Sequence, residues 1–217
     1  MNAVRRRKAW MIALAVVSGA FIGGFGVARM SSSDSSKVAT SSADDRFWGN
    51  LRLIAASEKE FFPTLAEMTS KADAVVLGEM VDLQVDRTIQ GDSPEDQVTY
   101  ARVDIAVERP LRGGAASRVS LDILLPNFPT RAKALEAEPA LKAGLPTDRM
   151  VFFLRKQQTA PHRYRLVNSL GLWSGGAGRA PVYTPLASGG SGRTVFAAEA
   201  AGLRGIDELA DYVSKSP

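Results

Sequence analysis

Residues 97–125 read QVTYARVDIAVERPLRGGAASRVSLDILL, and this stretch decides the fold class. Its first half carries apolar side chains at every second position, namely Ala101, Val103, Ile105 and Val107. After the glycine pair at 113–114, residues 118–125 repeat the alternation, with polar Ser120 and Asp122 between apolar neighbours. A period of two is typical of β-strands that bury one face. The stretch therefore predicts two strands whose apolar faces point into a core.

Further strand-like segments lie on both sides of this stretch. Residues 74–85 are rich in β-forming residues, and Gly78 is expected to mark a bulge or bend. Residues 150–155 (MVFFLR) predict a short, fully apolar strand, and further candidates follow at residues 164–168 and 194–198. Between them, a glycine-rich loop is expected at residues 171–178, which leads to Pro181-Val182-Tyr183. Six or seven short strands separated by turn signals predict a mainly β domain over residues 73–213, built as a small antiparallel barrel or sandwich.

Short helices are expected to flank this sheet. Residues 47–72 show helical periodicity, which Pro63 interrupts. A helix is also expected at residues 131–138, within the long connection of residues 126–146, and a closing helix at residues 206–213. No βαβ repeat is present, so a doubly wound nucleotide-binding fold is not expected.

The N-terminal region predicts a membrane anchor. Residues 9–28 are twenty residues without a charge, and a helix of that length spans about 30 Å, the thickness of one hydrocarbon core. The basic cluster of residues 5–8 precedes it, so the positive-inside rule places a tail of residues 1–8 in the cytoplasm and the rest of this single-pass chain outside. A cleaved signal peptide ending at Gly26-Val27-Ala28 is the alternative. Residues 31–46 are Ser-rich and predict a flexible tether.

The charge distribution argues against a nucleic-acid partner. The net charge is +4, but five of the 27 basic residues and none of the 23 acidic residues lie in residues 1–30. The remaining chain therefore carries 22 basic and 23 acidic residues, whereas binding to phosphates needs the positive charge on the folded surface. Single-strand nucleic-acid binding by a barrel remains a third, less favoured hypothesis.

Composition also restricts the chemistry. The chain has no cysteine and one histidine, so no thiolate metal site, iron–sulfur cluster or cysteine nucleophile is expected, and no cofactor is predicted. A Ser–His–acid triad would have to use His162, and the chain has no G-x-S-x-G elbow. Glu79 and Asp82 lie on one predicted strand, where alternation is expected to send them to opposite faces. No catalytic residue is predicted.

Three segments carry a family resemblance. They are ADAVVLGEM at residues 72–80, VDIAVERPLRG at residues 103–113, and residues 145–155 with MVFFLR at their end. Their order resembles that of small exported bacterial β-barrel domains, OB-like and netrin-type in layout, over about residues 70–185. The resemblance implies a fold and export but no chemistry. Eukaryotic netrin-type modules rely on disulfides that this chain lacks, so no inhibitory activity is carried over.

The candidate binding residues are Phe128, Trp173 and Arg179. Aromatic side chains on loops of a rigid barrel are a common recognition device, although the two aromatic rings could instead fill the ends of the barrel. The predicted function is thus a membrane-anchored extracytoplasmic module that binds a protein or envelope component without catalysis. The alternative is a cell-envelope hydrolase that uses paired carboxylates. Gly19 and Gly23 form a G-x-x-x-G motif through which two anchors could associate.

Overall fold

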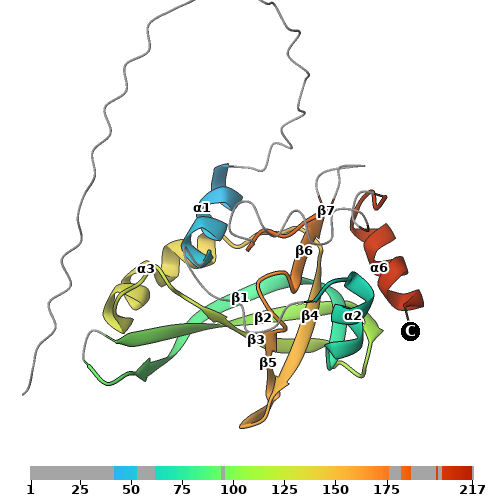
Figure 1. The fold of residues 1–217 in the computed structure, drawn as a ribbon. Helices are drawn as coiled ribbons and strands as arrows, with labels where there is room; N and C mark the ends of the chain where they lie inside the picture. The colour runs from blue at the N-terminus through green and yellow to red at the C-terminus, as the bar shows by residue number, and fades with distance from the viewer. Residues whose placement is uncertain are drawn as a thin grey trace, which may run out of the picture. The chain divides into compact units, whose positions relative to one another are not determined.

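The computed structural model describes residues 42–52, 62–93, 96–175, 182–186, 199 and 202–216 (Figure 1). The helices are α1 (Ser42–Leu51), α2 (Leu65–Lys71), α3 (Arg131–Ala143) and α6 (Ile206–Lys215). The strands are β1 (Ala74–Gln90), β2 (Gln97–Arg112), β3 (Arg118–Leu124), β4 (Met150–Gln157), β5 (Ala160–Leu166), β6 (Leu172–Gly175) and β7 (Val182–Tyr183).

The seven strands form one mixed sheet in the order β1-β2-β3-β5-β4-β6-β7, and β1 also pairs with β4. Strands β1, β2, β3, β5 and β4 therefore close partly into a ring. The domain is mainly β, as the sequence predicts, but β3 and β5 run parallel, which corrects the expectation of a fully antiparallel sheet. The reason is geometric: strand direction cannot alternate all the way around a ring with an odd number of strands, so one neighbouring pair must be parallel.

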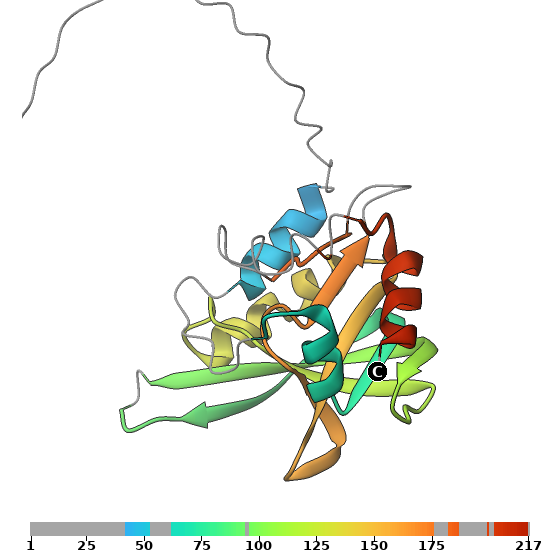
Figure 2. The same ribbon diagram turned by 45° about the vertical axis from the view of Figure 1, so that its right-hand side comes forward.

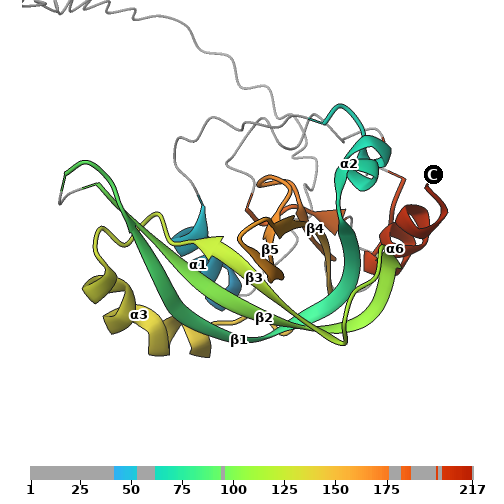
Figure 3. The same cartoon turned by 90° about the horizontal axis from the view of Figure 1, so that it is seen from below.

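Two apolar clusters lie on the two sides of this sheet. The first fills the ring with the alternating side chains of β2 and β3, and α1 and α3 pack against it through Trp48 and Leu141. The second lies on the other face of β1 and β4, where α2 and α6 cover it with Met68 and Leu209. Strand β4 is thus buried on both faces, which explains its continuous apolar run. Figure 2 shows α2 and α6 side by side, and Figure 3 shows α1 and α3 gathered away from them.

Strand β1 is irregular, and its register against β2 shifts four times. One shift falls between Leu77 and Gly78, which confirms the predicted bulge. A side chain at position 78 would meet the carbonyl oxygen of Ala106, so the close approach of β2 requires glycine there. Beyond the ring, β1 and β2 continue as a two-stranded arm (Figure 3).

The ends of several elements differ from the expected ones. Helix α3 continues through Pro139 to Ala143, because Leu141 in its last turn is buried in the first cluster. Helix α1 begins at Ser42, inside the stretch predicted to be a tether, and β6 forms where a glycine-rich loop was expected. The predicted strand at residues 194–198 and the predicted anchor at residues 9–28 lie outside the described residues. No helix among the described residues is long and apolar enough to cross a membrane.

Candidate functional site

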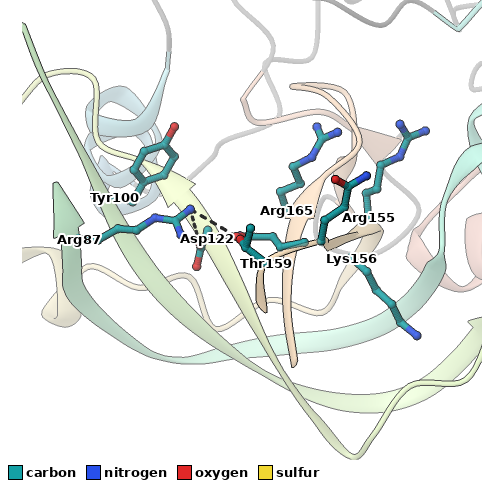
Figure 4. Close-up of a pocket in the computed structure, with 9 residues that line it drawn as sticks. Arg87, Tyr100, Asp122, Arg155, Lys156, Thr159 and Arg165 are labelled. Carbon is teal, nitrogen blue, oxygen red and sulfur yellow. Dashed lines mark hydrogen bonds and ion pairs between the residues drawn. The ribbon is translucent and has the colours of Figure 1, made fainter. Parts of the chain in front are cut away.

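A groove of about 570 Å³ lies beside the β4–β5 turn, on the outer side of the ring (Figure 4). Strands β1, β2 and β3 contribute Arg87, Tyr100 and Asp122 to its lining. Strand β4, the turn of residues 158–159 and strand β5 supply the rest of the lining. The lining therefore joins segments that are far apart in the sequence, which is typical of a site built on a rigid barrel.

Asp122 lies at the centre of the polar contacts in this groove. Its neighbours Leu121 and Ile123 point into the first cluster, so Asp122 faces outward, yet its side chain is only 2% exposed. One carboxylate oxygen accepts hydrogen bonds from Arg163, with Nε at 2.8 Å. The other forms an ion pair with Arg87 Nη2 at 2.9 Å and accepts a hydrogen bond of 2.6 Å from Gln157 Nε2. Three hydrogen bonds and one ion pair thus occupy most of the capacity of this carboxylate, which is about four acceptor positions.

A β-bulge brings two consecutive side chains of β1 toward this centre. Val85 pairs with Ala101 and Thr88 pairs with Thr99, so Asp86 and Arg87 together stand opposite Tyr100. A bulge of this kind re-aims side chains that regular alternation would separate. Here Arg87 reaches Asp122, while the Asp86 carboxylate accepts a hydrogen bond of 2.7 Å from Arg163.

Arg87 is held by several weak partners besides Asp122. Its guanidinium carbon lies 5.1 Å from the centre of the Tyr100 ring, a cation–π contact, and its Nη2 lies 3.4 Å from Oε1 of Gln157. Its Nε is buried and has no hydrogen-bond partner among the described residues. The side chain as a whole is 38% exposed, so its charged head is accessible from the groove.

The electrostatic character of the groove is basic. Its lining holds the cations Arg87, Arg155, Lys156 and Arg165. Among the described lining residues Asp122 is the one carboxylate, and Arg163 behind it adds a further positive charge. Burial lowers the pKa of Arg163, but the hydrogen bonds that Arg163 donates to Asp86 and Asp122 outweigh this effect, and the pKa stands above its ordinary value. With four cationic side chains in its lining, the groove is suited to an anionic ligand.

Of the three predicted site residues, the two aromatic ones pack in the apolar clusters. Trp173 is on β6 with 3% exposure in the second apolar cluster, and Phe128 packs, partly buried, against the first cluster. Arg179 lies outside the described residues. Neither aromatic ring lines the groove, and the binding role of these three residues stays a prediction.

Sequence reasoning missed the residues of the groove, although one signal was present. The sequence HRYR at residues 162–165 and the pair Arg155-Lys156 place cations on two neighbouring strand segments. Alternation alone would have put Arg163 and Arg165 on one outer face. The bulge that adds Arg87 has no such signal in the sequence.

The expectation that Glu79 and Asp82 lie on opposite faces of their strand is wrong. Met80 and Leu83 both lie in the first cluster, because the register shifts between Met80 and Asp82. Glu79 and Asp82 therefore both face away from that core. The Asp82 carboxylate forms an ion pair of 3.3 Å with Lys142 Nζ and accepts a hydrogen bond of 3.0 Å from Gln84 Nε2. His162 is exposed on β5, and the described residues contain no group of acidic or histidine side chains suited to a metal ion.

Comparison with known proteins identifies no relative. No protein-family model matches the chain, and neither the curated proteins nor the solved structures contain a significant match.

Proposed function

We propose that the chain is a membrane-anchored extracytoplasmic binding module whose folded part is a small OB-like barrel. The groove around Asp122 carries this proposal, because it is lined by cations and an aromatic ring that neighbouring strands hold in place. The partly closed ring of five strands supports the OB-like assignment, since that fold is a five-stranded, partly open barrel whose outer strand face and loops bind ligands.

The location is proposed from the sequence. The uncharged residues 9–28, the basic tail of residues 1–8 and the tether of residues 31–46 support a single-pass anchor with the barrel outside the cytoplasm. The partner is a protein or another component of the envelope, and association of two anchors through Gly19 and Gly23 remains part of the proposal.

A binding role is better supported than hydrolysis. A carboxylate-based hydrolase needs two carboxyl groups about 5–9.5 Å apart, one of which exchanges protons with the substrate. The one carboxylate among the described groove-lining residues already accepts hydrogen bonds from Arg163 and Gln157 and forms an ion pair with Arg87. Asp122 thus acts as a structural anion that orients the surrounding donors.

The proposal is tested by site-specific photo-crosslinking of the full-length chain in intact cells. A photoreactive residue at Thr159, on the groove rim, is expected to trap a specific envelope component. The same residue at Lys133, which is exposed on α3 outside the groove, is the matched control. Equal adducts at both positions, or none at Thr159, would contradict a binding role for the groove.

The location has its own test. Because the chain has no cysteine, a single cysteine introduced at Lys133 is the one thiol available. We expect a membrane-impermeant maleimide to label this cysteine in cells whose cytoplasmic membrane is intact. Labelling only after that membrane is disrupted would place the barrel in the cytoplasm.

A further inference from the structure

Two exposed apolar side chains lie opposite each other on the two-stranded arm that β1 and β2 form beyond the ring (Figure 3). Ile89 and Val98 are direct register partners there, and they are 51% and 40% exposed. Thr99 is 1% exposed and continues the inward alternation of Ala101, so the apolar pair faces the outer side of the sheet. A projecting pair of strands with aliphatic side chains on an open face is suited to contact another molecule.

The same outer face carries opposite charges on the two sides of this apolar pair. Toward the ring, the next outward position on β1 is Arg87, which lies over the Tyr100 ring. Toward the tip, the next outward position on β2 is Asp96, which is exposed. Asp96 lies opposite Gly91, because a Cβ atom at Gly91 would fall 2.6 Å from that of Asp96. The outer face of the arm therefore presents a cation, an apolar pair and an anion in order.

Such a face is complementary to itself. A twofold axis that lies between two arms and runs across their strands would place the apolar pair of one copy against that of the other. It would also lay the tip of each arm over the ring end of the other arm, so that Asp96 of each copy meets Arg87 of the second copy. A symmetric contact repeats each interaction, so it contains two such ion pairs.

Arg87 can take part in this contact without leaving Asp122. Its Nη2 is the atom that contacts Asp122 and Gln157, and its buried Nε has no partner among the described residues. A guanidinium group has five N–H donors, so donors remain for a second carboxylate. The side chain is 38% exposed, and a carboxylate from another molecule can therefore reach its charged head.

The charges of the arm favour a second copy over two other occupants. Asp92 and Asp96 are both exposed at the tip, so an anionic bilayer surface or a nucleic-acid backbone would be repelled there. A second copy instead supplies a cation for the tip, an anion for the ring end and an apolar pair between them.

We propose that two copies of the chain associate through the outer faces of their arms, with Ile89 and Val98 at the twofold axis and Asp96 paired with Arg87 of the second copy. This inference goes beyond the proposed function and does not depend on what the groove binds. The contact is small, so the association is weak and depends on concentration.

The test is thiol crosslinking of the full-length chain in uncharged detergent micelles at low ionic strength. The chain has no cysteine, so V98C places a single thiol at the proposed axis, where a short bismaleimide should link two copies. V81C is the matched control, because Val81 is 42% exposed on β1 and lies outside the arm. We expect V98C to give about tenfold more crosslinked dimer than V81C.

Charge reversals identify the ion pairs. In the V98C chain, D96K should lower the crosslinking yield about tenfold, because both ion pairs of the dimer become repulsive. D148K reverses the same charge at an exposed position between α3 and β4, and it should leave the yield unchanged. High salt should lower the yield of V98C, since these charges are exposed to solvent.

The same variants separate the arm contact from association of the anchors. Dimers held only by Gly19 and Gly23 would crosslink equally at V98C and V81C and would not respond to D96K; either result would overturn the arm interface. Sedimentation equilibrium of the cysteine-free chain is a second readout, in which I89K should lower the dimer fraction and D148K should not. An unchanged dimer fraction in I89K would also overturn it, whereas a groove-specific crosslink at Thr159 would leave the proposed function standing.

Discussion

At the scale of single residues, the groove depends on a carboxylate that faces outward and is nevertheless buried. Asp122 is bound by Arg87 and Arg163, whose side chains are 38% and 22% exposed. We expect Asp122→Asn to lower the free energy of unfolding by about 2–3 kcal/mol, because it removes charge-assisted hydrogen bonds from Arg163 and the ion pair with Arg87. A urea titration at neutral pH measures this change.

The control for this prediction lies on the adjacent strand. Asp104 accepts a hydrogen bond of 2.8 Å from Ser120, and it is 3.8 Å from Arg102 in a more exposed setting. Asp104→Asn should therefore change the free energy of unfolding by no more than about 1 kcal/mol. An equal loss in both variants would mean that the burial of Asp122 does not strengthen its ion pairs.

Asp82 provides a prediction about pH. Burial raises the pKa of its carboxyl group, but the hydrogen bond and charge of Lys142, together with the backbone of Leu83, outweigh this and bring the pKa below its ordinary value of 3.8. A carboxyl group with a depressed folded-state pKa contributes stability above its ordinary pKa and loses that contribution as the pH falls through the folded-state value. Asp82→Asn should thus reduce stability at neutral pH slightly and flatten its decline below pH 3.8. Parallel acid-unfolding curves for both chains would refute this.

At the scale of elements, the bulges of β1 explain why sequence reasoning located the strand but not the site. Alternation predicts the strand and its buried residues from local sequence alone. The register depends on how β1 fits the curvature of the ring, and a single extra residue reverses the face of every later side chain. This is why Glu79 and Asp82 share a side, and why Arg87 joins the groove.

Helix α3 supports the bulged segment of β1. The Glu138 carboxylate accepts a hydrogen bond of 2.7 Å from the backbone N–H of Val85, directly before the bulge. We expect Glu138→Ala to cost about 1–3 kcal/mol in unfolding free energy, because a partly buried backbone donor loses its charged partner. Faster hydrogen exchange at the Val85 amide should accompany this loss.

Glu136 on the same helix is the matched control. It forms an exposed ion pair of 2.7 Å with Lys133, three residues away. Pairs of this type contribute about 0.2–0.5 kcal/mol, so Glu136→Ala should leave the Val85 amide unchanged. If that variant also accelerated exchange at Val85, the effect would belong to the helix as a whole.

At the scale of the whole molecule, local pattern predicted the β class and the approximate position of most described strands. It could not predict the closure of the ring or the parallel β3–β5 pair, because both depend on which strands meet after α3 crosses over. The position of the site also depends on strand pairing, which the local sequence does not determine. Trp173 was expected on a loop, but pairing of β6 with β4 places its side chain in the second cluster. The groove combines residues from five strands, and no single segment carries that information.

Both ion pairs and apolar burial hold the C-terminal helix α6 against the sheet. Arg149 contacts Glu108 of β2 at 2.6 and 2.7 Å and Asp207 of α6 at 3.0 and 3.1 Å. The hydrogen bonds that Arg149 donates, first to Glu108 and then to Asp207, raise its pKa against the opposing effect of burial. Both carboxylates are exposed by half or more, so solvent screens these pairs. Leu209, by contrast, is fully buried in the second cluster.

These contacts predict different outcomes for two substitutions. Leu209→Ala should lower the free energy of unfolding by about 2–5 kcal/mol, because it leaves a cavity beneath α6. Arg149→Gln should lower it by no more than about 1 kcal/mol, and high salt should remove most of the difference. Urea titrations at two salt concentrations, with hydrogen exchange at the amides of α6, measure both effects. If Arg149→Gln proved as damaging as Leu209→Ala, ion pairing rather than apolar burial would hold α6 on the sheet.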